Sequence, residues 1–83
     1  MKENMSKVFV SYVLYELDPM GTGCFENLQT DEYNTEADQI ANMVRAGFSV
    51  SYSVKTVFEV MFWDDCLSDE SLNTICEKLS NNF

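Results

Sequence analysis

The segment from Lys7 to Leu17 constrains the fold of this chain more than any other, because its alternating positions are apolar on both faces. It is rich in Val, Phe, Tyr and Leu, a composition that favours strands. A strand with two apolar faces usually lies in the centre of a sheet. The chain has 83 residues, enough for one domain with a thin core. We therefore expect a single domain over residues 1–83, with residues 1–6 frayed.

Two further segments have the composition of strands. The sequence from Asp18 to Gly23 contains a proline and two glycines, so it predicts a hairpin turn, followed by a shorter strand over Cys24–Gln29. The stretch from Phe48 to Asp64 is too long for one strand, and Val54–Trp63 is its best strand candidate. Residues 48–52 fit either a loop or a short extra strand.

Two segments predict amphipathic helices. The first has Thr35 as its N-cap and Gly47 as a left-handed cap, with the apolar stripe Ala37, Ile40, Ala41 and Val44 between them. The second has Ser68 as its N-cap, Leu67 and Leu72 as a hydrophobic staple, and the stripe Leu72, Ile75, Cys76, Leu79 and Phe83. The order of elements predicts an α+β fold, a small two-layer domain. An antiparallel hairpin and a long strand carry two helices on one face, as ββαβα, or ββαββα with the extra strand.

Charge is the feature that bears most directly on function. There are 14 Asp and Glu against 5 Lys and Arg, a net charge of -9. Every acidic residue except Glu3 falls in one of two blocks without a basic residue, Glu16–Asp38 and Glu59–Glu77. Such a chain repels nucleic acid and anionic membranes, which excludes direct binding to either. Clustered carboxylates can imitate a phosphate backbone and occupy the basic groove of a nucleic-acid-binding protein; the alternative is a surface that is merely acidic and solubilising.

The residue types needed for most catalytic sites are missing. The chain has no histidine, which excludes Ser-His-Asp and Cys-His catalysis and His-ligated zinc. Its three cysteines, Cys24, Cys66 and Cys76, are widely spaced and form no C-x-x-C pair, so they fit small apolar core residues in a reducing compartment. Asp64, Asp65, Asp69 and Glu70 offer oxygen ligands, but an EF-hand loop counted from Asp64 lacks the required glycine. We expect no enzyme activity, no metal and no cofactor.

The sequence shows no pattern typical of a targeting signal or of a membrane span. The first residues lack the apolar segment of a signal peptide, and no apolar run approaches the length of a membrane span. We therefore expect a cytoplasmic protein.

Short, acidic, histidine-poor α+β chains of this kind resemble phage-encoded inhibitors, among them anti-CRISPR proteins, inhibitors of restriction enzymes and DNA-mimicking uracil-glycosylase inhibitors. The resemblance rests on chain length, the two acidic blocks and the two capped helices. It assigns no role to any single residue. It implies a stoichiometric inhibitor of a host nucleic-acid enzyme in the host cytoplasm.

The sequence thus predicts an acidic protein that blocks a basic protein surface. Helix capping accounts for Glu36 and Asp38, but it does not account for Glu26, Asp31 and Glu32. The expected contact residues are Glu26, Asp31, Glu32, Glu36, Asp38, Met61, Trp63, Asp64 and Asp65. The alternative is a small structural or oligomerisation domain that uses an apolar sheet face, including Val57, Met61 and Trp63, to form a homodimer.

Overall fold

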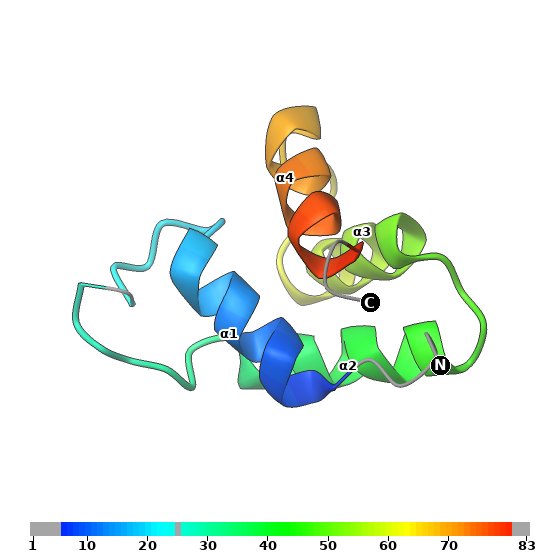
Figure 1. The fold of residues 1–83 in the computed structure, drawn as a ribbon. Coiled ribbons are helices and arrows are strands. Elements are labelled where there is room, and N and C mark those ends of the chain that lie inside the picture. The colour runs from blue at the N-terminus through cyan, green and yellow to red at the C-terminus, as the bar shows by residue number, and fades with distance from the viewer. Residues whose placement is uncertain (1–5, 25, 81–83) are drawn as a thin grey trace.

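Four helices make up the regular structure of the described residues (Figure 1). The computed structural model describes residues 6–24 and 26–80. The helices are α1 (Lys7–Leu17), α2 (Asn34–Arg45), α3 (Val50–Met61) and α4 (Asp69–Ser80). Each helix contacts the next along the chain, and α4 also contacts α1, which closes the bundle. The long α1–α2 connection leaves the bundle on one side, and the short α2–α3 turn lies at the opposite end of α2.

The prediction of an α+β fold is wrong, because the described residues contain no strand. The segment expected as the central strand, Lys7–Leu17, is α1, and most of the expected long strand Val54–Trp63 lies in α3. The expected return strand over Cys24–Gln29 lies in the α1–α2 connection, where the described residues form turns. Because the described residues contain no strand, the predicted two-layer arrangement and the predicted apolar sheet face are also wrong.

Helical periodicity explains the error in both segments. In α1 the side chains of Val10, Val13 and Leu14 are buried and Leu17 packs against them, which is the spacing of one helix face. In α3 the positions Val54, Val57, Phe58 and Met61 repeat the same spacing. α1 also carries the apolar side chains of Val8 and Tyr12 on its exposed side, so it is apolar around more of its circumference than its buried face alone would make it. That distribution also resembles a strand with two apolar faces.

Both predicted helices are confirmed. α2 buries Ala37, Ile40 and Ala41, and Gly47 has a φ of 110° after its end. There the Gly47 N–H donates to the carbonyl of Val44 and the Phe48 N–H donates to that of Met43, the Schellman arrangement. The prediction of Thr35 as N-cap is wrong, since the cap position is Tyr33, whose side chain makes no capping hydrogen bond.

At the start of α4, Ser68 Oγ accepts a hydrogen bond from the Ser71 N–H at 3.1 Å, as its predicted capping role requires. Ile75 and Leu79 are buried, and Leu67, Leu72 and Cys66 pack against the core. The predicted continuation of the stripe to Phe83 lies outside the described residues, as does most of the expected frayed segment 1–6. Ser6 is described, and it caps α1 by accepting from the Val8 N–H.

The core draws on all four helices and on the α1–α2 connection. Its largest fully buried side chains include Tyr33 from the connection, Phe58 from α3, Leu14 from α1 and Ile40 from α2. The Tyr33 and Phe58 rings lie 6.2 Å apart between centroids. Since Tyr33 ends the connection and is itself in the core, the connection is fixed to the bundle at that point.

Candidate functional site

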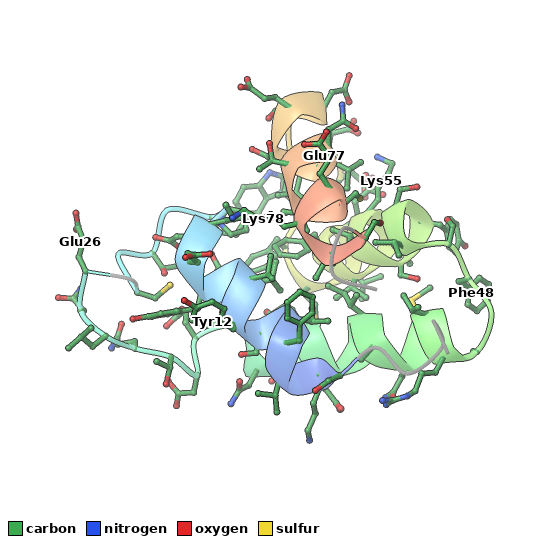
Figure 2. All side chains as sticks on the ribbon, viewed as in Figure 1. Tyr12, Glu26, Phe48, Lys55, Glu77 and Lys78 are labelled. Carbon is green, nitrogen blue, oxygen red and sulfur yellow. The ribbon has the colours of Figure 1, made fainter. Side chains whose placement is uncertain are left out.

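The candidate site is the acidic loop, which we define as residues 26–32 of the α1–α2 connection. All seven residues of this loop are exposed, and three of them are the acids Glu26, Asp31 and Glu32. Figure 2 shows Glu26 projecting from the connection into solvent, away from the helices. The loop therefore presents carboxylates outward, on the side of the molecule where the connection leaves the bundle.

Asp18 holds the base of this loop. It follows α1 directly, in the left-handed region at φ 47°. Its carboxylate accepts hydrogen bonds from the Thr22 N–H at 2.9 Å, the Thr22 hydroxyl at 2.8 Å, the Gly23 N–H at 2.7 Å and the Tyr33 hydroxyl at 2.9 Å. The Tyr33 hydroxyl in turn accepts from the Met20 N–H at 3.0 Å. One carboxylate thus joins the start of the connection to its end.

These contacts change the acidity of both groups. Partial burial pushes the pKa of Asp18 upward, but the hydrogen bonds from Thr22, Gly23 and Tyr33 outweigh burial and lower that pKa to about 2. Burial raises the pKa of the Tyr33 phenol, and the neighbouring Asp18 carboxylate raises it further. Near neutral pH, Asp18 is therefore ionised and Tyr33 protonated, the states that this network requires.

Cys24 is a second anchor of the connection. Its side chain is fully buried, and its Sγ donates to the Tyr15 carbonyl of α1 at 3.4 Å. The Gln29 N–H donates to the Cys24 carbonyl at 2.8 Å, which folds the acidic loop back on this anchor. The loop is thus tied to the bundle by Asp18, Cys24 and Tyr33 rather than suspended between two helix ends.

Leu28 lies within the acidic loop and has an unfavourable backbone conformation. It has a φ of 57°, a region that residues with bulky side chains seldom occupy. Its side chain is also 78% exposed, so no packing in the described structure compensates for this backbone. Strained, exposed apolar residues of this kind cluster at binding sites. The sequence analysis missed Leu28, and nothing in the sequence indicates its positive φ.

The acids of the loop have no ion pair with any described basic residue. Lys7 Nζ lies 3.9 Å from Asp38, Lys78 Nζ lies 3.9 Å from Glu16, and Lys55 Nζ lies 2.7 Å from Glu59 and 3.5 Å from Asp65. Arg45 donates to the Asn42 side chain at 2.7 Å. These four cations therefore contact other groups, and among the described residues no cation pairs with Glu26, Asp31 or Glu32.

The two other predicted contact residues of the first block lie in α2. Glu36 is only 9% exposed, in the first turn of the helix, where the helix dipole favours an anion. Asp38 is half-buried and faces Lys7 of α1. Three of the five predicted contact residues in this block thus lie together on the acidic loop. The other two lie in α2, where Glu36 is in the first turn and Asp38 pairs with α1.

The predicted contact residues of the second block lie at and after the end of α3. Trp63 is 60% exposed and packs edge to face against Phe62, with ring centroids 6.2 Å apart. Asp64 and Asp65 are exposed, and Asp65 pairs with Lys55. Met61 is half-buried against the core. Hydrogen bonding to Glu59 raises the pKa of Lys55, and the same bond lowers the pKa of Glu59, so this end of the molecule is partly neutralised.

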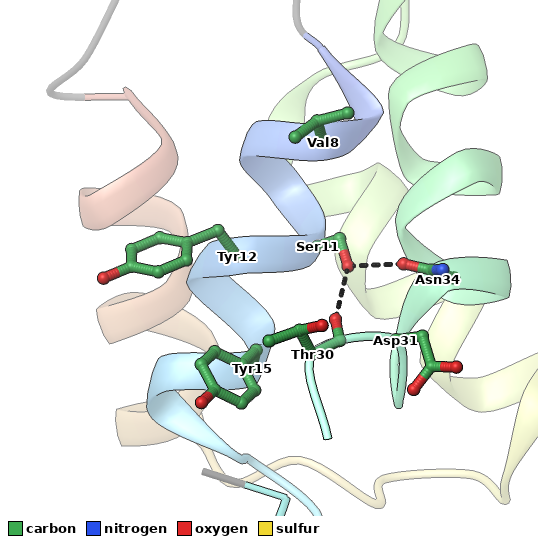
Figure 3. A pocket seen from close by; sticks show the side chains of 7 residues that line it. All are labelled: Val8, Ser11, Tyr12, Tyr15, Thr30, Asp31 and Asn34. Atoms are coloured by element: carbon green, nitrogen blue, oxygen red, sulfur yellow. Dashed lines mark hydrogen bonds between the residues drawn. The ribbon is translucent and has the colours of Figure 1, made fainter. Parts of the chain in front are cut away.

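A groove adjoins the acidic loop, and we call it the Tyr12 groove (Figure 3). It has a volume of about 280 Å³ between α1 and the segment where the loop enters α2. Its lining residues are Val8, Ser11, Tyr12, Tyr15, Thr30, Asp31 and Asn34. At its floor, the Ser11 hydroxyl donates to Asn34 Oδ1 at 2.7 Å and lies 3.5 Å from the Thr30 carbonyl oxygen. Ser11 and Tyr12 are further residues that the sequence analysis did not select.

Other functional chemistry finds little support in the described residues. Within residues 6–24 and 26–80, no three Cys, Asp or Glu side chains are grouped so that they could hold a metal ion. None of the described helices is long and apolar enough to cross a membrane. Cys24 is buried and Cys66 and Cys76 are half-buried, and burial raises the pKa of the Cys76 thiol, so these residues fit the predicted role of small core side chains.

Comparisons with protein-family models, with curated proteins and with solved structures find no match to this chain. The acidic loop and the Tyr12 groove are therefore the features of the molecule that bear on its function.

Proposed function

We propose that this chain is a non-enzymatic binding protein whose acidic loop covers the basic surface of a nucleic-acid-binding protein. The observation that carries the proposal is the set of three exposed carboxylates that pair with no described basic residue, on a loop that Asp18, Cys24 and Tyr33 fix to the core. A fixed set of charges loses little conformational freedom on binding, in contrast to acids on a flexible tail. This is the property that a substitute for a phosphate backbone needs.

The location and biological role follow as a finer part of the same proposal. A net charge of -9 steers association toward basic surfaces, and host nucleic-acid enzymes carry such surfaces. We propose that the protein is encoded by a phage or another mobile element. It acts in the host cytoplasm, where it inhibits a host defence protein.

The test is a pair of charge-reversal variants with the same change in net charge. Asp31→Lys with Glu32→Lys alters the acidic loop, and Asp64→Lys with Glu77→Lys alters two exposed acids elsewhere. All four positions are exposed, and substitutions at exposed positions usually change stability by less than about 0.5 kcal/mol, so we expect both variants to fold. Each variant and the original protein is immobilised and exposed to host lysate at low and at high salt, and captured proteins are identified and their affinities measured.

We expect a nucleic-acid-binding protein to be retained at low salt and released at high salt. The acidic-loop variant should bind this protein at least about tenfold more weakly than the original chain does, a loss of about 1.4 kcal/mol. The control variant should bind it with unchanged affinity. Equal loss in both variants would reduce the effect to net charge. Loss in the Asp64 and Glu77 variant alone would move the contact surface to the second block. Retention of no nucleic-acid-binding protein at low salt would reject the proposal.

A second candidate, self-association, is favoured by the exposed face of α3. Tyr52 and Val60 are exposed large apolar side chains on α3, and the exposed Trp63 follows shortly after its end. Sedimentation as a function of concentration would distinguish the two candidates. A monomer whose Trp63 fluorescence does not change with protein concentration would rule out self-association through this face.

A further inference from the structure

We propose that the Tyr12 groove binds an arginine side chain of the protein partner, with its aliphatic stem on α1 and its guanidinium between the tyrosine wall and Asp31. This inference rests on the proposed function and adds to it the chemistry that the groove recognises. The groove borders the acidic loop through Thr30 and Asp31, so a partner seated on the loop also faces the groove.

The α1 side of the groove is a wall of apolar and aromatic surface. Val8 is 71% exposed and Tyr12 is 53% exposed, although both are large side chains on a helix that packs on two others. The Tyr12 and Tyr15 rings lie 6.1 Å apart between centroids and are tilted by 44°, so the buried ring supports the exposed one. An aliphatic stem can cover such a wall, and a guanidinium group stacks on an aromatic face.

The opposite side of the groove offers hydrogen-bond acceptors and negative charge. The Ser11 hydroxyl already donates to Asn34, so its proton is used within the chain. The Thr30 carbonyl already accepts from the Ser11 hydroxyl at 3.5 Å, so the exposed carboxylate of Asp31 is the charged acceptor that remains on this side (Figure 3). Acceptors beside an aromatic wall complement a ligand that is a cation and a donor at once. Arginine fits better than lysine because its planar group both stacks and donates several hydrogen bonds.

No described basic side chain of the protein itself lines this groove. The nearest candidate is Lys7, which borders a neighbouring cavity together with Val8 and Asn34. Its ammonium lies 3.9 Å from Asp38 on α2. The charge of Asp31 therefore has no described partner within the chain, and a cation from outside would supply one.

The probes are four blocked tripeptides of the form acetyl-Gly-X-Gly-amide, in which X is arginine, lysine, citrulline or norleucine. Citrulline has nearly the shape of arginine without its charge, and norleucine keeps only an apolar stem. Amide chemical shifts of the full chain are followed by NMR during each titration. We expect saturable shifts around Ser11, Tyr12 and Thr30, with arginine binding more tightly than lysine, and at least about threefold more tightly than citrulline or norleucine.

Two variants at exposed positions test the two sides of the groove. Tyr12→Leu keeps an apolar side chain but removes the ring, and Asp31→Asn removes the charge. Each should weaken binding of the arginine peptide about threefold or more. Glu77→Gln removes one exposed carboxylate on α4, outside the groove, and should leave binding unchanged.

The proposal is overturned if citrulline or norleucine binds as well as arginine, which would mark a purely apolar groove. It is also overturned if the shifts spread over all acidic segments and respond equally to Glu77→Gln, which would mark general attraction of cations. If a basic protein partner binds through Glu26 and Glu32 but its affinity is unchanged by Tyr12→Leu, the arginine site is rejected and the proposed function stands. If the arginine peptide binds but no basic protein partner is found, the arginine site stands and the proposed function is rejected.

Discussion

At the scale of single residues, Asp18 controls how the acidic loop is held. Its carboxylate accepts four hydrogen bonds, and its pKa is lowered from 3.8 to about 2. A carboxyl group whose pKa is lowered by folding stabilises the fold at pH values above its pKa in the unfolded chain. This stabilisation is lost as the pH falls through the pKa of the group in the folded chain. Asp18→Asn should therefore lower the free energy of unfolding near neutral pH by about 1–2 kcal/mol.

Chemical denaturation over a range of pH values checks this prediction. The difference between the original protein and Asp18→Asn should be constant near neutral pH, begin to shrink at about pH 5, and shrink further as the pH falls through 3.8 to about 2 and the original carboxyl becomes protonated in both states. Asp64→Asn, at an exposed position, is the control and should show no such difference. A difference that stays constant down to the lowest pH would mean that the charge of Asp18 is not what stabilises the connection.

Leu28 is the residue at which stability and binding are expected to conflict. Because its φ is 57° and its side chain is 78% exposed, Leu28→Gly relieves backbone strain without removing core packing. The variant should gain about 1 kcal/mol of stability by denaturation. If Leu28 is an apolar contact within the acidic loop, the same variant should bind the basic partner several-fold more weakly. Tighter or equal binding by the stabilised variant would show that the strain has no part in recognition.

At the scale of elements, residue composition and periodicity gave opposite answers for α1 and α3. Their Val, Phe and Tyr content favours strands, whereas the spacing of Val10, Val13 and Leu14, and of Val54, Val57 and Phe58, is helical. Packing of these faces onto neighbouring helices outweighs the small intrinsic preference of each residue. For α2 and α4 composition and periodicity agree, and both helices were predicted correctly.

The capping serines were the local signal that could have corrected the prediction for α3. Ser49 Oγ accepts a hydrogen bond from the Tyr52 N–H at 3.1 Å, which marks the start of a helix inside the segment that the composition left undecided. Ser49→Ala should lower the stability by about 1 kcal/mol. Ser51→Ala, at an exposed position inside α3, should be neutral or slightly stabilising because alanine favours helices. Equal effects of the two variants in thermal unfolding would contradict the role of Ser49 as a cap.

At the scale of the whole molecule, the sequence predicted where the acids lie along the chain but not how they are grouped in space. The acid blocks, the absence of histidine and the wide spacing of the three cysteines could all be read directly from the sequence. The sequence does not show that Glu36 is separated from Glu26, Asp31 and Glu32. That separation depends on where α2 begins and on which side of α2 meets the core. The Tyr12 groove was equally out of reach, since it forms between α1 and a loop 15 or more residues further along the chain, from Thr30 onward.

Net charge acts on the molecule as a whole, and its effect on stability can be measured with salt. The molecule has a radius of gyration of 11.6 Å. The Debye length falls from about 30 Å at 0.01 M salt to about 8 Å at 0.15 M, so repulsion that spans the whole fold at low salt is screened at the higher concentration. With a net charge of -9 and few ion pairs among the described residues, that repulsion should outweigh the attraction within the pairs. The melting temperature should therefore rise over this range, by about 4–8 °C for each 1 kcal/mol of repulsion relieved.

The acidic-loop variant supplies the internal control for this measurement. Asp31→Lys with Glu32→Lys removes two negative charges and adds two positive ones, which changes the net charge from -9 to -5. Its melting temperature should be higher than that of the original protein at low salt and should rise less with added salt, because less repulsion remains to be screened. A melting temperature that falls with salt in both proteins would instead show that the Lys55, Lys78 and Lys7 pairs dominate. The acids of the loop would then impose no cost on the fold, and their lack of ion pairs would no longer distinguish a surface kept for a partner from one that is only solubilising.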